Sequence, residues 1–93
     1  MNKIEAYDSV WDAISDTRFE AANMRAKSEL MRKIASFIKK KKWTQNKAAS
    51  HCGVTQPRMN DLLQGRISNF SIDALVNIAT SLGLQIHIEV KAA

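Results

Sequence analysis

Disulfide bonds are excluded within this chain, because its 93 residues contain a single cysteine, Cys52. The adjacent His51 does not complete a metal site, since two neighbouring ligands lack zinc-type spacing. Three glycines form no Gly-rich phosphate loop, and neither a pair of carboxylates nor a Ser, His and Asp set suggests a catalytic cleft. We therefore expect a reduced, cytoplasmic protein that is not an enzyme and that holds no metal or cofactor.

Long apolar runs are also missing from the sequence. The first ten residues, MNKIEAYDSV, lack the apolar segment of a signal peptide, and no run approaches the roughly 20 residues of a membrane span. Secretion and a membrane partner are therefore not expected. The length and the 45% hydrophobic content predict a small globular protein with one modest core.

Positive charge dominates the chain but is unevenly distributed. The 14 Lys and Arg exceed the 9 Asp and Glu, which gives a net charge of +5 and favours a polyanionic partner. Residues 1–20 hold five acidic and two basic side chains, so the excess of positive charge lies after them. We expect residues 1–26 to form an acidic arm with the start of a long helix, and residues 27–93 to form the basic, functional domain.

Residues 44–65, TQNKAASHCGVTQPRMNDLLQG, predict two short helices that meet at a turn. Thr44 and Thr55 fit as N-caps, since a Thr oxygen accepts from the free N–H groups of a first turn. Ala49 leaves room where the helices cross, and Gly53 suits the tight turn between them. The face of the second helix that remains outside is polar: Gln56, Arg58, Asn60, Asp61 and Gln64.

This stretch resembles the lambda-repressor-like (Cro/cI or XRE) family of bacterial and phage DNA-binding proteins. The matching residues are Gln45, Ala49, Gly53, Val54, Gln56, Met59, Leu62 and Gly65. The resemblance implies a mainly α-helical, lambda-repressor-like bundle of about five helices and a sequence-specific transcriptional repressor of double-stranded DNA. A helical hairpin with no role in DNA binding is the alternative.

Two sets of side chains are candidates for DNA contact. Gln56, Arg58 and Asn60 are expected to read bases, because the start of a recognition helix enters the major groove, where Gln pairs with adenine and Arg with guanine. Phosphate contacts are expected from Lys42, Thr44, Gln45, Lys47, Thr55, Gln64 and Arg66. The run Lys39–Lys42 is equally explained as a solvated helix end whose charge suits the helix dipole.

Before this pair of helices, residues 1–7 have no periodic pattern and are expected to be loose. Residues 8–14 fit a short helix, and the capping box of residues 17–20 predicts the start of a long helix that reaches Lys42. Ser28 followed by Glu29 offers a second start. A kink within residues 23–28 and an arm that projects beyond the core therefore remain open alternatives.

After Gly65, Ser71 fits as the cap of a further helix that Gly83 ends. Residues 84–90 then alternate strictly and predict one β-strand, whose apolar face consists of Leu84, Ile86, Ile88 and Val90. A single strand leaves its backbone groups unpaired, so we expect it to pair with the same strand of a second copy. The resulting homodimer would bind a two-fold operator.

A resemblance to small members of the same family, antitoxins of the HigA type, extends further along the chain. It rests on GVTQPR, DLLQG, FSIDAL and LGL and implies an autoregulated toxin–antitoxin operon with a small basic toxin as partner. Trp11 and Phe19 in the acidic arm are candidate contacts for that partner, or else core residues of the protein itself. A plain phage or bacterial XRE-type repressor is the alternative function.

Overall fold

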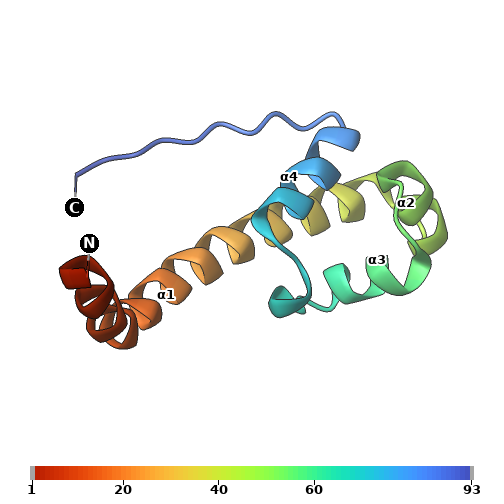
Figure 1. The fold of residues 1–93 in the computed structure, drawn as a ribbon. Helices are drawn as coiled ribbons and strands as arrows, with labels where there is room; N and C mark the ends of the chain where they lie inside the picture. The colour runs from red at the N-terminus through yellow and green to blue at the C-terminus, as the bar shows by residue number, and fades with distance from the viewer. Residues whose placement is uncertain (1, 93) are drawn as a thin grey trace.

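The computed structural model describes the backbone of residues 2–92 and the side chains of residues 18–92. Within that part of the chain the elements are α1 (Asn2–Lys41), α2 (Gln45–Cys52), α3 (Gln56–Leu63), the 3-10 helix η1 (Ile67–Asn69) and α4 (Ile72–Ser81). Figure 1 shows α1 extending well beyond the core, with the other helices gathered against its C-terminal half. The expected mainly helical fold is confirmed.

The helix α1 is continuous where the sequence suggested separate pieces. One helix replaces the loose stretch expected at residues 2–7, the short helix expected at residues 8–14 and the new helix starts expected at residue 17 or 28. The described chain therefore contains four α-helices where about five were expected. The physical reason is that residues 2–41 contain neither proline nor glycine, so nothing interrupts helical hydrogen bonding.

Of the described side chains of α1, only those toward its C-terminal end enter the core. Every side chain from residue 18 to residue 26 is exposed, whereas Met31, Ile34 and Ile38 are almost completely buried. Their spacing of three and four residues places them on one face of the helix. They pack with buried residues of the later elements: Ala48, Ala49, Cys52, Met59, Leu62, Phe70, Leu75, Ile78 and Ala79.

Each α-helix ends in the same hydrogen-bonded turn. After α2, α3 and α4 a glycine takes the left-handed conformation, and the N–H groups of the glycine and of the next residue bond back to carbonyls of the last turn. After α1 the left-handed residue is Lys42, with φ 58°. All three glycines of the chain are therefore used to stop helices, and the end that Gly83 was expected to mark is confirmed.

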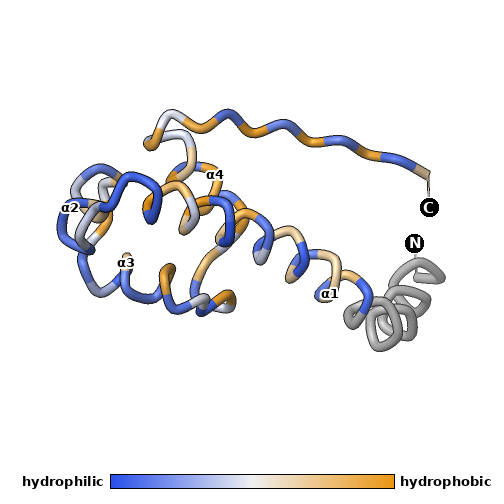
Figure 2. Tube along the Cα trace, turned by 180° about the vertical axis from the view of Figure 1, so that it is seen from behind, coloured by the Kyte–Doolittle hydropathy of each residue, from blue (hydrophilic) through white to orange (hydrophobic). Residues whose placement is uncertain are grey.

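The C-terminal segment leaves the core as extended chain. Leu84 and Ile86 are partly buried against the core, but Ile88 and Val90 are 75% and 88% exposed. Figures 1 and 2 show the segment leaving α4 and running away from α2 and α3, on the side of the core from which α1 also projects. The expected strand is not formed among residues 2–92, because pairing needs a second strand and one copy of the chain supplies none. Pairing with a second copy stays a prediction.

Candidate nucleic-acid interface

The two short helices expected from residues 44–65 are present, and both begin at the predicted caps. Thr44 precedes α2 and its Oγ1 accepts from the backbone N–H of Lys47 at 3.2 Å. Thr55 precedes α3 and its Oγ1 accepts from the N–H of Arg58 at 3.3 Å. Pro57 stands in the first turn of α3, where its missing N–H has no helical partner to lose. The start of α3 is thus locally determined.

The turn between α2 and α3 is fixed by Gly53 and by small side chains. Gly53 has φ 68° and ψ 30°, and the N–H of Val54 bonds to the carbonyl of Ala49 at 3.0 Å. Ala48 and Ala49 are buried, which allows α2 and α3 to approach closely. From α3 itself, Met59 and Leu62 fill the core. This arrangement fixes which face of α3 points outward.

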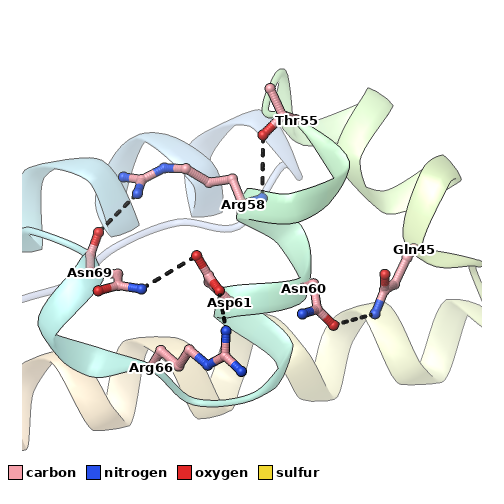
Figure 3. Close-up of polar contacts among 7 residues, drawn as sticks. All are labelled: Gln45, Thr55, Arg58, Asn60, Asp61, Arg66 and Asn69. Carbon is pink, nitrogen blue, oxygen red and sulfur yellow. Dashed lines mark hydrogen bonds and ion pairs between the residues drawn. The ribbon is translucent and has the colours of Figure 1, made fainter.

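Asn60 lies near the middle of α3 and is bonded to the start of α2. The Nε2 atom of Gln45 donates to Oδ1 of Asn60 at 3.0 Å (Figure 3). Both side chains are half-buried. The bond crosses the turn and holds the two helices together on their outer side. It also leaves Nδ2 of Asn60 as a donor, because only the oxygen of that amide is used in the bond.

Arg58 folds back onto the protein. Its guanidinium carbon lies 4.2 Å from the centre of the Phe70 ring, and its Nη1 donates to the carbonyl oxygen of Asn69 at 2.8 Å. Phe70 is buried and therefore held in place by the core, so its ring gives the guanidinium a rigid aromatic surface to stack on. Sequence reasoning missed both contacts, because they join α3 to the segment that follows it.

Asp61 connects α3 to the same segment. One of its carboxylate oxygens pairs with Nη1 of Arg66 at 2.8 Å, and the other accepts from Nδ2 of Asn69 at 3.3 Å (Figure 3). Arg66 was expected to lie near phosphates, but neither Asp61 nor Asn69 was selected as a site residue. The only indication in the sequence that Asp61 belongs to this site is its position on the polar outer face of the second predicted helix.

An aromatic cluster lies beside the lysine run at the C-terminal end of α1. Trp43 stacks on His51 with ring centres 4.0 Å apart and an interplanar angle of 2°, and it meets the edge of Phe37 at 6.1 Å. The ammonium group of Lys41 lies 5.5 Å from the centre of the Phe37 ring. The cluster ties the last turns of α1 to the last turn of α2.

Cys52 faces inward from the last turn of α2. Burial raises the pKa of its thiol, and a hydrogen bond with Ser81 opposes this effect without cancelling it. The neutral thiol therefore belongs to the core.

Residues 13–91 match a protein-family model described as a helix-turn-helix domain. The chain belongs to this helix-turn-helix family. An XRE family transcriptional regulator of known structure has a similar fold, with a TM-score of 0.74 and 22% sequence identity over 80% of this chain and 83% of that one. No curated protein with a matching sequence was found. The resemblance to HigA-type antitoxins has no counterpart in these matches and stays a hypothesis.

The helix-turn-helix domain carries its predicted phosphate contacts on one basic segment. Residues 39–66 contain seven Lys and Arg and one acidic residue, Asp61. Six of the expected phosphate contacts are exposed, namely Lys42, Thr44, Lys47, Thr55, Gln64 and Arg66. The seventh, Gln45, is half-buried. Of the expected base readers, Gln56 is exposed, while Arg58 and Asn60 are half-buried in the bonds described above.

Among the described side chains, the other predicted site residues lie outside the segment of residues 39–66. Phe19 is 60% exposed on α1, and the apolar side chains of residues 84–90 become progressively more exposed toward the C-terminus. Trp11 lies outside the side chains that the structure describes. Within the described chain, no helix combines the length and apolar character needed to cross a membrane.

Proposed function

We propose that this protein is a sequence-specific regulator of transcription that inserts the start of α3 into the major groove of double-stranded DNA. The observation that supports this most is the placement of polar side chains on α3. Met59 and Leu62 point into the core, whereas Gln56 is exposed on the outer face of the first turn of α3. The helix pair of such domains meets DNA with this face.

Phosphate binding would fix the position of α3 in the groove. Lys42, Lys47 and Arg66 are exposed, and the N-terminal end of α2 offers backbone N–H groups beside Thr44. Contacts of this kind do not depend on base sequence, but they set the register of the recognition helix. We expect the other exposed polar residues, Thr55 and Gln64, and the half-buried Gln45 to contribute in the same way.

Base reading is assigned chiefly to Gln56. Its side chain is exposed, and among the hydrogen bonds of the described residues none involves it. A Gln amide pairs bidentately with adenine. Asn60 can assist as a donor through Nδ2 while its oxygen stays bonded to Gln45. Arg58 can reach a base only after it leaves Phe70 and Asn69.

Selection of DNA from a random pool by the purified protein tests the proposal. We expect enrichment of a short sequence, tighter than random duplex by a factor of about 10³ or more at physiological salt, with an affinity that falls steeply as salt rises. The control is a Gln56→Ala variant, which should keep its binding to random duplex and show much weaker enrichment of the selected sequence. Binding with no sequence preference by the wild-type protein would refute a regulator that recognises an operator.

We also propose that the protein acts as a homodimer on a two-fold site. Among the hydrogen bonds of the described residues, none involves the backbone after Leu84, and the apolar face of this extended segment continues from Leu84 and Ile86 to the exposed Ile88 and Val90. An antiparallel pairing with a second copy would satisfy the backbone and cover these side chains. The selected DNA should then contain inverted half-sites about 10 bp apart, or a multiple of one helical turn.

A second candidate function, the antitoxin of a toxin–antitoxin pair, is supported by the exposed arm. Residues 18–26 are exposed throughout, Phe19 is 60% exposed, and residues 1–20 carry more acidic than basic side chains. A segment of this overall charge suits a small basic protein, and the exposed Phe19 could serve as an aromatic anchor for it. Deletion of residues 1–20 should abolish co-purification with the product of the neighbouring gene and leave DNA affinity within a few-fold. Aggregation of the shortened chain would show instead that the arm is part of the fold.

A further inference from the structure

Asp61 stands out because it is the one acidic residue between Lys39 and Arg66. A carboxylate on a face that meets phosphates opposes binding by charge repulsion. Its side chain is 25% exposed and bonded at both oxygens, so it is neither a free surface charge nor part of the apolar core. In the free protein this carboxylate holds two residues of the segment that follows α3, Arg66 and Asn69.

Asp61 holds the segment after α3 through both its side chain and its backbone. The carboxylate binds Arg66 at 2.8 Å and Asn69 at 3.3 Å, which brackets η1 from both ends. The backbone carbonyl of Asp61 accepts from the N–H of Arg66 at 3.0 Å. Gly65, with φ 75°, makes the reversal of the chain that brings Arg66 back over the helix.

Arg66 keeps most of its donors while it is paired. A guanidinium has five N–H groups, and the ion pair with Asp61 uses Nη1. The Arg66 side chain is 56% exposed, more than twice as exposed as that of Asp61. A phosphate can therefore bind the outer edge of the guanidinium while Asp61 holds the inner edge, and the arginine need not be ordered at the moment of binding.

We propose that Asp61 is a positioning residue for DNA binding, which orients Arg66 toward a phosphate of the DNA backbone. This inference rests on the proposed function and adds a residue to it. It predicts that the carboxylate favours DNA binding despite its negative charge, and that it does so only through Arg66.

A double-mutant cycle on a mixed-sequence duplex of about 20 bp tests the proposal, since phosphate contacts need no known operator. We expect Asp61→Ala and Arg66→Ala each to weaken binding about tenfold and to lower the slope of log affinity against log salt by about 0.9, which corresponds to one phosphate. The double variant should bind no more weakly than Arg66→Ala alone. Asp61→Asn keeps an oxygen for Arg66 and should bind within about threefold of the wild-type protein.

Several outcomes would overturn the inference. If Asp61→Ala and Asp61→Asn both bind DNA more tightly, the carboxylate acts only by repulsion. If Asp61→Ala weakens binding as much in the Arg66→Ala background as in the wild type, it does not act through Arg66. A purely structural role would lower thermal stability and leave the salt slope unchanged. Failure of the wild-type protein to bind any duplex would refute the proposed function itself, which is a separate result.

Discussion

Replacing Arg58 by alanine separates two roles for this residue. The sequence suggests an arginine that reads guanine from the first turn of the recognition helix. The structure places its guanidinium 4.2 Å from the centre of the Phe70 ring and 2.8 Å from the carbonyl oxygen of Asn69. We therefore predict that Arg58→Ala lowers the stability of the fold more clearly than it changes sequence preference.

The magnitudes come from the contacts that Arg58 must give up. The stack on Phe70 contributes about 0.5–1 kcal/mol at a partly exposed site. A hydrogen bond from a charged donor contributes about 1 kcal/mol after allowance for partial exposure. A bidentate contact with guanine yields about 1–3 kcal/mol of discrimination. Loss of the internal contacts offsets most of that gain, so the net advantage of moving Arg58 to a base is close to zero.

The assay compares Arg58→Ala, Gln56→Ala and wild type in urea unfolding and in binding to the selected and the random duplex. For Arg58→Ala we expect the free energy of unfolding to fall by about 1–2 kcal/mol, and the affinities for the two duplexes to fall by similar factors. For Gln56→Ala we expect unchanged stability and a loss of about 1–3 kcal/mol on the selected duplex only.

Arg58→Lys serves as the matched control, because it keeps the charge and loses the planar stack on the ring. It should restore part of the binding to random DNA without restoring the full stability. The reasoning is refuted if Arg58→Ala leaves the unfolding curve unchanged and loses more than about tenfold in affinity on the selected duplex alone. That result would mean that Arg58 leaves Phe70 at little cost and reads a base.

Three further changes test other parts of the structure. Ile88→Pro removes an N–H and an apolar side chain from the extended segment, so sedimentation should show monomers where wild type forms dimers; a monomeric wild type would refute the pairing. Gly53→Ala should lower the free energy of unfolding by about 1–2 kcal/mol through left-handed backbone strain alone, because an added Cβ meets no atom within 4 Å. Gly53→Asn should lower the free energy of unfolding by less, and an equal decrease for the two variants would contradict this explanation. Burial raises the pKa of the Cys52 thiol, so the neutral thiol stabilises the fold fully at neutral pH and this stabilisation is lost as pH rises through the alkaline range. The free energies of unfolding of wild type and Cys52→Ala should therefore converge with rising pH. A difference that stays constant with pH would exclude the effect.

Local signals in the sequence were sufficient to predict the helix-turn-helix. The caps at Thr44 and Thr55 and the turn at Gly53 lie where they were expected, because each depends on residues within one turn of the chain. The same logic explains the error in α1. The capping box of residues 17–20 is a start signal, but no stop signal precedes it, and a helix without proline or glycine continues through such a motif.

The C-terminal segment shows a different limit. The alternation of residues 84–90 correctly indicates extended chain with an apolar side, and Leu84 and Ile86 lie against the core on that side. A strand, however, is defined by hydrogen bonds to another strand, and residues 2–92 of one copy contain no such strand. The sequence predicts the conformation of the segment but cannot by itself establish its partner.

The side-chain contacts of the binding face were the least predictable part, and Asp61 and Arg66 show why. Five positions on a regular helix would place two side chains on different faces, so their spacing gives no reason to pair them. They meet because α3 ends at Leu63 and the chain reverses at Gly65, which brings the N–H and the guanidinium of Arg66 back over Asp61. The pairing changes the electrostatics of the basic segment, since it neutralises the one negative charge there. A charge count along the sequence suggests that Asp61 weakens DNA binding by repulsion. In the folded chain Asp61 instead holds the arginine that we propose to face a phosphate.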